Sequence, residues 1–329
     1  MSMSFYPEPI PGEVEVARRK YGKYHQIGIW PFYPDIPLFQ VLKTTAILDP
    51  EKTTILHPKK MTIKEIDTLS DKLAAALADL GAKKGDTVAL YMWNSPEFVL
   101  AFFGILKTGA IVTALDPSFK EKDAQHQLED SESMMLIVDE EQYHIINGIR
   151  EKLPRLKNVV VVGEKRRPDA YLFKELVEKY PPNPPEVEIN PKKDLAILQY
   201  TAGTTGLPKG CMLTHYNVVS NIFQLALTHG LEGTRDDIIL AHLPFYHIYG
   251  MTTLICASVC FGLSIVIQKR FDMEEFLELI QTFKVTVVST VMPVLTLLTQ
   301  FPDFLNQYDL SSLRYMSSGA TPMVPETAR

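Results

Sequence analysis

Cysteine is scarce in this sequence of 329 residues, which has three: Cys211, Cys256 and Cys260. An odd number without paired spacing argues against a disulfide framework and favours a reducing compartment. Cys256 and Cys260 are four residues apart, on one face of an expected helix, but no histidine or cysteine stands near them at the spacing of a zinc site. We therefore expect both side chains to fill the core.

An excess of positive charge is also absent. The formal net charge is −6, with 33 lysines and arginines against 39 aspartates and glutamates. A chain of this charge has no electrostatic footprint for nucleic acid or for an anionic membrane surface, so we expect neither as a partner. Hydrophobic residues make up 46% of the chain, which is enough to bury a sizeable core in one large domain or two smaller ones.

The sequence shows no signal peptide and no clear membrane span. Its first residues lack the basic start and the apolar stretch of a secretory signal. The uncharged run 251–268 comes closest to a span, but Gly262 divides it and several hydroxyl side chains interrupt it. This run predicts a buried helix followed by a buried strand at 263–267, in a soluble cytoplasmic protein.

Strand patterns and helix patterns alternate along most of the chain. The segment Thr62–Glu65 reads as a capping box that opens a helix, and Ser95 reads as the cap of a second helix. Expected strands follow at 87–91, 110–115, 135–138, 159–162, 195–199, 211–213, 237–241, 263–267 and 285–288. Strands that alternate with helices predict an α/β fold with mostly parallel sheets covered on both faces.

This pattern divides the chain into three parts. Residues 1–35 have little periodicity and are expected to form an N-terminal arm. Residues 36–235 are expected to form a first α/β subdomain, and residues 236–329 a second one. A crevice between two such units suits a nucleotide site.

Residues 200–210 form an unusual loop between two expected strands, with the sequence Tyr-Thr-Ala-Gly-Thr-Thr-Gly-Leu-Pro-Lys-Gly. The glycines allow backbone conformations with positive φ, so that successive N–H groups can converge on an anion. The threonine hydroxyls add hydrogen-bond donors, and the lysine adds a positive charge. This composition predicts a loop that binds polyphosphate.

The loop is not a Walker A motif. That motif requires G-x-x-x-x-G-K-[ST] leading directly into a helix. Here two residues separate Gly206 from Lys209, Gly210 follows the lysine, and a strand is expected before the next helix. On composition alone, an ordinary glycine- and threonine-rich hairpin with a solvated lysine is an equal alternative.

The loop resembles the phosphate-loop signature of the adenylate-forming superfamily, which comprises acyl- and aryl-CoA synthetases, luciferases and the adenylation domains of peptide synthetases. Ala202 departs from the signature, because the family usually has a second hydroxyl there. The resemblance implies the fold of the family's large N-terminal domain, with two mostly parallel sheets flanked by helices. It also implies that the nucleotide is bound by Thr201, Ala202, Gly203, Thr204, Thr205, Gly206 and Lys209.

Residues 243–250, Leu-Pro-Phe-Tyr-His-Ile-Tyr-Gly, are similar to the family's next motif. The similarity implies that His247 is a catalytic residue beside the reacting carboxylate, and that His247, Tyr249 and Met251 line an acyl pocket. The alternatives are a histidine satisfied by backbone partners in a turn and a methionine in the core. Amino-acid-activating relatives place an aspartate just after this motif, whereas 250–256 is uncharged here. A buried ammonium group would lack a counter-charge, which favours a simple fatty or aryl acid.

Two further segments resemble family motifs. Lys269-Arg-Phe is similar to a segment whose basic residue meets CoA phosphates, which makes Arg270 a candidate CoA ligand; a solvated arginine at a helix entry is an equal alternative. Residues 310–323 are similar to the family's adenine-proximal loop, which implies that Gly319, Ala320 and Thr321 contact the base. The family more often has Ala-Pro where this chain has Thr321-Pro322.

The resemblance implies ATP-dependent activation of a carboxylic acid, with a fatty acid favoured, to acyl-AMP and then to acyl-CoA. ATP, Mg and CoA are the implied substrates and cofactors, and a homodimer is compatible with the family. The family's later motifs, including its Mg-binding residue and the C-terminal domain with the catalytic lysine, would follow Arg329. We therefore expect an N-terminal part of the enzyme, incomplete in its second subdomain, without a metal ligand of its own and inactive alone.

Two alternatives differ in class. One is a non-catalytic module that binds a nucleotide or an acyl group and forms no product. The other is an adenylating enzyme that loads an acyl carrier protein, which would form the adenylate but no CoA thioester.

Overall fold

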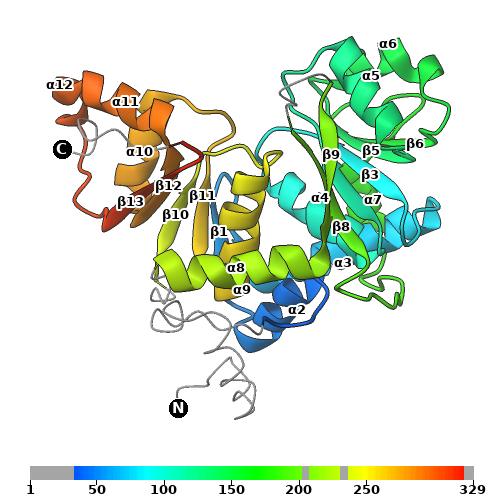
Figure 1. The fold of residues 1–329 in the computed structure, drawn as a ribbon, viewed down its shortest axis with the longest axis horizontal. Coiled ribbons are helices and arrows are strands. Elements are labelled where there is room, and N and C mark those ends of the chain that lie inside the picture. Colours follow the sequence, from blue (N-terminus) through cyan, green and yellow to red (C-terminus); the bar gives the residue numbers. More distant parts are fainter. Residues whose placement is uncertain (1–32, 202–206, 230–235, 322–329) are drawn as a thin grey trace, which may run out of the picture.

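Two β-sheets with helices packed on them make up the computed structural model of this chain, which describes residues 33–201, 207–229 and 236–321 (Figure 1). The seven-stranded sheet has the order β7 (Tyr171–Leu172), β6 (Asn158–Val162), β5 (Met135–Asp139), β3 (Thr87–Tyr91), β4 (Ile111–Ala114), β8 (Leu195–Thr201) and β9 (Lys209–Thr214). Its strands are parallel except β9, which pairs antiparallel with β8. The expected α/β class is confirmed.

The six-stranded sheet has the order β13 (Tyr315–Gly319), β12 (Val287–Val291), β10 (Ile238–Ala241), β11 (Ser264–Ile267), β1 (Thr53–His57) and β2 (Met61–Thr62). The short β2 alone runs antiparallel within it. Residues 53–62 were expected in the first subdomain, and in the structure Ile55 of this segment pairs with Ile265 of β11. The next helix, which follows β2 directly, packs on the other unit, so the chain crosses between the units at Thr62.

Local signals explain where several helices begin. Thr62 Oγ1 accepts the Glu65 N–H, and a Glu65 carboxylate oxygen accepts the Thr62 N–H, so the predicted capping box is confirmed at the start of α3 (Ile63–Asp79). Ser95 caps α4 (Pro96–Lys107) by accepting the Phe98 N–H at 3.1 Å. Each such cap contributes roughly 1 kcal/mol to helix stability.

The remaining helices cover the two sheets. Those of the first part of the chain are α2 (Phe39–Leu48), α5 (Glu121–Asp130), α6 (Tyr143–Ile149) with a 3₁₀ turn η2 (Arg150–Lys152), and α7 (Phe173–Lys179). Those of the second part are α8 (His215–His229), a π-helical segment η3 (Gly250–Cys256), α9 (Ala257–Phe261), α10 (Met273–Phe283), α11 (Met292–Gln300) and α12 (Pro302–Leu305). In the part of the chain that the structure describes, none of the helices has both the length and the apolar composition for a membrane crossing.

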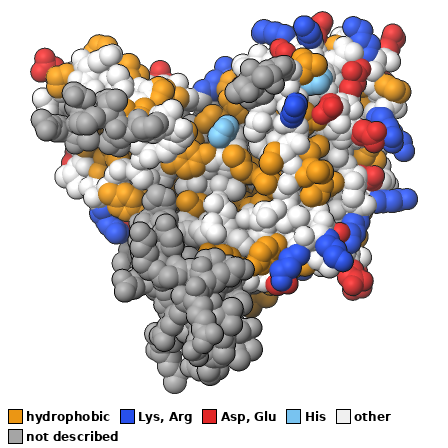
Figure 2. Space-filling model, viewed as in Figure 1, with side chains coloured by type: hydrophobic (Ala, Val, Ile, Leu, Met, Phe, Trp, Pro, Cys, Tyr) orange, Lys and Arg blue, Asp and Glu red, His pale blue; other side chains and the backbone are white. Residues whose placement is uncertain are grey.

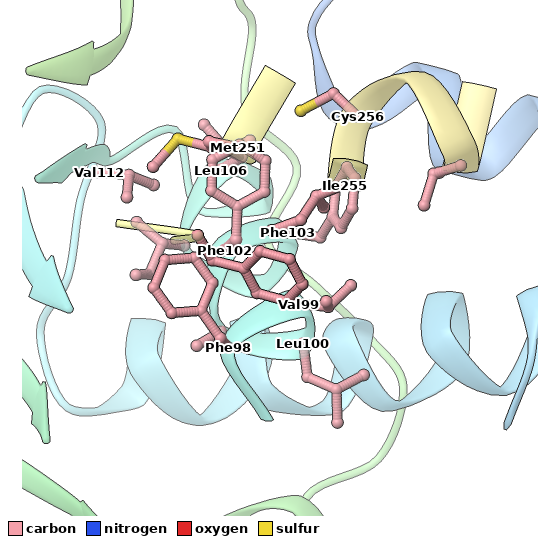
Figure 3. Close-up of a cluster of buried hydrophobic side chains, with 14 of the residues drawn as sticks. Phe98, Val99, Leu100, Phe102, Phe103, Leu106, Val112, Met251, Ile255 and Cys256 are labelled. Carbon is pink, nitrogen blue, oxygen red and sulfur yellow. The ribbon is translucent and has the colours of Figure 1, made fainter. Parts of the chain in front are cut away.

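Helix α4 lies in the middle of the main core. Eleven of its twelve residues are buried. Figure 3 shows its aromatic and aliphatic side chains gathered beside Val112 of β4 and beside Met251, Ile255 and Cys256 of η3. Since fully burying one such side chain contributes about 2 kcal/mol, this shared core joins the two units strongly.

Helix α8 adds a second connection between the units. It follows β9 of the seven-stranded sheet, and Figure 1 shows it extending to the region of α9 on the other side. The rings of Phe223 on α8 and Phe261 on α9 meet edge to face, with their centroids 5.9 Å apart. The run 251–268 forms η3, α9 and β11. Most residues of these three elements are buried, Cys256 among them, which confirms the predicted buried helix and strand.

Candidate functional site

The expected phosphate loop stands at the open end of a β-hairpin. Strands β8 and β9 pair antiparallel up to Thr201 and Lys209, which are register partners, and both residues are exposed. The expected nucleotide-binding residues Ala202, Gly203, Thr204, Thr205 and Gly206 lie outside the described residues. The hairpin therefore brings the two ends of the loop, one with a hydroxyl and one with an ammonium group, side by side.

Helix α5 contacts the hairpin at β8 and at the residue just before β9. The Tyr200 hydroxyl donates to Asp130 of α5, and burial raises the pKa of that hydroxyl above its usual value. His126 of α5 places Nε2 3.3 Å from the Pro208 carbonyl oxygen on the other side of the loop. Both sides of the expected phosphate loop are thus anchored to one helix of the seven-stranded sheet.

The expected acid motif forms a compact turn between β10 and η3. The His247 N–H donates to the Pro244 carbonyl at 3.2 Å, and the Met251 N–H donates to the His247 carbonyl at 2.9 Å. Gly250 is required here, because a Cβ at that position would lie 2.1 Å from the Pro244 oxygen. We call residues 243–250 the acid turn.

His247 presents its imidazole at the surface of the acid turn. Its Nδ1 accepts the Tyr249 N–H at 3.1 Å, so the proton of the neutral ring is on Nε2. The loss of water on the protein side lowers the pKa of His247 below its usual value. The backbone partner anticipated from the sequence is present, and the Nε2–H of this exposed residue remains a donor.

Tyr249 lies against the end of β13. A Cβ added to Gly319 would be 3.1 Å from both the Tyr249 Oη and the Cζ of its ring. The hydroxyl lies within hydrogen-bonding reach of Ser317 and Ser289, which themselves are joined Oγ to Oγ at 3.2 Å. The acid turn and the expected adenine segment therefore meet at Tyr249.

The adenine segment is a strand for most of its length. Sequence reasoning gave 310–323 as a loop, whereas 315–319 forms β13, which pairs in parallel with β12. Ala320, directly after the strand, has φ of +68°, a strained left-handed conformation for a residue with a Cβ. The Thr321 N–H bonds back to the Gly319 carbonyl at 2.9 Å.

Met251 does not accompany His247 and Tyr249 to the surface. It is fully buried and lies in the cluster of Figure 3 with Phe98, Phe102 and Val112. Its placement agrees with the alternative of a core residue, because the π-helical segment that begins at Gly250 turns it inward.

Arg270 is neither free nor simply solvated. Its guanidinium forms an ion pair with Glu141, which follows β5, and lies 4.1 Å over the ring of Trp93, which follows β3. Lys269 Nζ also bonds Glu141, at 2.6 Å, and this hydrogen bond is the main cause of the lowered pKa of the Glu141 carboxyl. The segment expected to bind CoA thus crosses from β11 to the carboxyl edge of the other sheet.

A cleft of about 770 Å³, with many charged residues in its lining, lies beside these ion pairs. Its lining combines the ends of β1, β5, β6 and β11 and includes Asp139, Glu141, Arg167 and Lys269. Burial raises the pKa of Asp139 to about 6, although its carboxylate accepts the Trp93 N–H at 2.8 Å. Figure 2 shows the molecule notched between its two units.

Sequence reasoning missed five residues at this edge, of which all but Asp139 contact the other unit: Trp93, Asn94, Asp139, Glu141 and Gln199. One signal could have found most of them. The first four follow β3 or end or follow β5, and the carboxyl ends of parallel strands are where α/β sheets bind ligands.

The residues present fit a nucleotide. Ser318 Oγ is buried without a hydrogen-bond partner among the described residues, next to the strained Ala320, and Lys209 supplies a cation at the mouth of the phosphate hairpin. The described residues offer no comparable set of ligands for a metal ion. Among residues 33–201, 207–229 and 236–321, no three histidine, cysteine, aspartate or glutamate side chains come together as metal ligands.

The fold and these segments agree with known proteins. Residues 42–329 match the family model described as AMP-binding enzyme. The chain is 35% identical over 268 residues to 4-coumarate–CoA ligase 1 of Petroselinum crispum, and the aligned region covers 80% of this chain and 48% of that protein. It is 32% identical over 313 residues to a probable 4-coumarate–CoA ligase 1 of Dictyostelium discoideum, covering 89% of this chain and 56% of the relative.

Among solved structures, a long-chain-fatty-acid–CoA ligase from Archaeoglobus fulgidus superposes with a TM-score of 0.83 at 30% identity, over 90% of this chain and 60% of that one. An anthranilate–CoA ligase in complex with anthranoyl-AMP superposes with a TM-score of 0.80 at 26% identity, over 90% and 57%. This chain belongs to the family of AMP-binding enzymes, and the resemblance noted in its sequence is confirmed. It spans about half the length of the first curated relatives that it matches.

Proposed function

We propose that this chain forms the nucleotide- and acid-binding part of an AMP-forming acid–CoA ligase. One observation supports this most directly: the adenine segment and the strand that leads into the phosphate loop both contact the acid turn. Gln199 of β8 donates from Nε2 to the Tyr246 carbonyl at 3.2 Å, and Tyr249 lies against Gly319 of β13. The phosphate hairpin, the acid turn and the adenine segment are therefore held around one small volume.

The proposed reaction has two steps. In the first, a carboxylate oxygen of the acid attacks the α-phosphorus of ATP and pyrophosphate leaves. In the second, the CoA sulfur attacks the carbonyl carbon of the acyl-adenylate and AMP leaves. The protein contributes chiefly positioning and stabilisation of the negative charge that develops during both steps.

Each segment has a distinct part in this proposal. The residues at the tip of the hairpin hold the phosphates through backbone N–H groups and hydroxyls, and Lys209 adds a positive charge. The phosphate-binding residues are Thr201, Ala202, Gly203, Thr204, Thr205, Gly206 and Lys209. Gly319, Ala320 and Thr321 edge the base. Bound Mg would neutralise part of the phosphate charge. His247 directs its Nε2–H at the reacting carboxylate, Tyr249 bounds the acid site, and Arg270 pairs with CoA phosphate.

The acid is proposed to be a carboxylic acid without an ammonium group. Every residue from Gly250 to Cys256 is buried and uncharged, so a substrate cation there would have no partner. A fatty acid is the first candidate. An aryl acid is the second, because the 4-coumarate–CoA ligases cited above share about a third of their aligned residues with this chain.

The test is ATP–pyrophosphate exchange with short, medium, long-chain and aryl acids. It compares the polypeptide 1–329 with the product of the full open reading frame that contains it. We expect exchange with one acid class in the longer product and none above background in residues 1–329. Exchange with amino acids only would contradict the acid assignment. ATP binding without exchange in either protein would support a non-catalytic module, and exchange without CoA thioester would support loading of a carrier protein.

A further inference from the structure

Asn94 is a buried amide at the junction of the two sheets. It follows β3 of the seven-stranded sheet and only 4% of its surface is exposed. Its Oδ1 accepts the Phe245 N–H at 2.7 Å, and its Nδ2 donates to the Leu243 carbonyl at 2.9 Å, to the Gln268 carbonyl at 3.2 Å and, at the longer distance of 3.5 Å, to the Ala241 carbonyl. All four partners belong to the other unit.

The partners leave one orientation for this side chain. An amide has one acceptor oxygen and two donor hydrogens, and here one N–H faces the oxygen while three carbonyls, with that of Ala241 the most distant, face the nitrogen. The Asn94 amide therefore satisfies backbone groups that no water would reach, since Phe245 beside it is fully buried. Shortening the side chain would leave these groups unpaired.

The two segments that Asn94 holds are those with candidate site residues. Leu243 and Phe245 begin the acid turn, which continues directly to His247 and Tyr249. Gln268 immediately precedes Lys269 and Arg270. The acid turn is tightly closed between Pro244 and Gly250, because these two residues lie against each other. A shift at Phe245 is therefore passed to His247.

The neighbouring side chain extends the same contact. Trp93 lies under the Arg270 guanidinium and meets the Tyr246 ring edge-on, with centroids 6.4 Å apart. Trp93 and Asn94 thus reach both segments from a single point at the carboxyl edge of β3.

We propose that Asn94 is a positioning residue for the ligase reaction, which fixes the acid turn, and with it His247, relative to the seven-stranded sheet. This role rests on the proposed function. Asn94 contacts no substrate in it and acts through the backbone of residues 243–245 and 268.

The first experiment does not depend on activity. Hydrogen–deuterium exchange is measured on residues 1–329 and on two variants, Asn94→Ala and Asn158→Ala. Asn158 is the matched control, because its Nδ2 also donates to a backbone carbonyl, that of Leu80, at 2.8 Å. Asn158 is the first residue of β6 and so lies at the amino ends of the parallel strands, opposite to Asn94. We expect Asn94→Ala to speed exchange in peptides covering 243–250 by roughly tenfold or more, while Asn158→Ala leaves them unchanged. Unchanged exchange in Asn94→Ala would overturn the proposal.

The second experiment measures steady-state kinetics in the full open reading frame product. We expect Asn94→Ala to lower kcat/KM for the acid by roughly 100-fold, the cost typical of misplaced reacting groups, while KM for ATP changes less than about threefold. Asn158→Ala is expected to keep wild-type values. If the wild-type protein shows no ATP–pyrophosphate exchange, the proposed function fails. The hydrogen–deuterium exchange measurement still tests whether Asn94 positions the acid turn.

An isosteric variant keeps the proposal testable should alanine prevent folding. Asn94→Asp retains the acceptor for Phe245 and, when protonated, regains one donor toward Leu243. Its kcat/KM relative to wild type is expected to rise as the pH falls from about 8 to about 6, since a buried carboxyl has a raised pKa. A flat ratio would contradict a role through this donor.

Discussion

The phenol of Tyr249 lies directly on the backbone of Gly319, with 3.1 Å between Tyr249 Oη and the position that a Cβ of Gly319 would occupy. These residues are 70 positions apart and come from two different motifs. Their contact closes the acid turn onto the end of β13, near the strained Ala320 and near the Ser318 hydroxyl, which is without a hydrogen-bond partner in the described part of the chain. The acid turn and the expected adenine segment thus lie against each other.

Gly319→Ala is expected to damage the acid site without unfolding the protein. The added methyl group requires the Tyr249 ring to move by a few tenths of an ångström, so kcat/KM for the acid should fall on the order of tenfold. Gly104→Ala is the matched control, because its Cβ would lie 3.0 Å from the flexible Leu73 side chain, in the core of α3 and α4. Exchange assays and thermal unfolding are compared for both variants. Equal loss of activity in the two would contradict a specific role of Gly319.

The roles of the two ring nitrogens of His247 can be distinguished by substitution. His247→Asn keeps an acceptor near the Nδ1 position for the Tyr249 N–H, whereas His247→Ala removes both functions. If Nε2 is the group that acts on the carboxylate, both variants should lose roughly 100-fold or more in pyrophosphate exchange, the scale of one lost transition-state donor. Near-normal exchange in His247→Asn would limit the histidine to holding the turn.

The pH profile checks the same residue. Because burial lowers the pKa of His247, the imidazole is neutral at pH 7 and stays neutral below the usual histidine value. Exchange that depends on neutral His247 should therefore hold constant as the pH falls toward about 6.5 and decline only below it. The measurement is kcat/KM for the acid against pH in wild type. A decline that begins above the ordinary pKa of histidine would contradict the assignment.

Arg270 and Glu141 should act in opposite directions on CoA. Arg270→Ala is expected to raise KM for CoA about tenfold, the value of one moderate charged contact, and to leave pyrophosphate exchange unchanged. Glu141→Gln removes the competing carboxylate and should lower KM for CoA. Arg155→Ala serves as control, because Arg155 forms an exposed pair with Glu132 at 3.1 Å. A fall in exchange and in thioester formation together would place Arg270 outside CoA binding.

Buried histidines should make the fold sensitive to acid. Burial lowers the pKa of His242 to about 4, and that of His215 likewise to about 4, so the unfolded chain takes up protons that the native chain does not. Stability is therefore full above the unfolded pKa near 6.5 and is lost as the pH falls toward 4, by roughly 2 kcal/mol per histidine at about pH 5.

The check is urea unfolding of wild type and His242→Gln at neutral and acidic pH. The raised pKa of Asp139 acts in the opposite direction, since that carboxyl is protonated more readily in the native chain, but it is common to both proteins and cancels in their difference. We expect wild type to lose roughly 2 kcal/mol more than His242→Gln on acidification. Parallel losses would show that His242 does not titrate with unfolding.

Local signals in the sequence were sufficient for much of the fold. The capping box at Thr62 and the cap at Ser95 were predicted because a cap depends on residues within one helical turn, and both are confirmed. The pairing of β1 with β11 could not be predicted in this way. A five-residue strand such as Thr53–His57 contains no local signal of its partner, and Ile55 finds Ile265 only through the packing of the intervening chain.

For the site, the motif segments were predictable and their supports were not. Residues 243–250 and 319–321 are recognisable as strings, and the structure brings the described parts of both together at Tyr249. Asn94 and Trp93 form no string, since each acts through one side chain across the sheet edge. Met251 shows the converse limit, because an apolar residue beside a motif can face either a pocket or the core.

The pairing of Ile55 with Ile265 also sets an order of events during synthesis. When the ribosome has made β1 and β2, the strand that will lie between β1 and β10 does not yet exist, and more than 200 residues must still be added. Closing a loop of that length is entropically slow compared with local contacts, so the seven-stranded sheet has time to form first. Until then one edge of β1 has no partner strand, and an exposed strand edge of this kind is where an incomplete chain can pair with another chain.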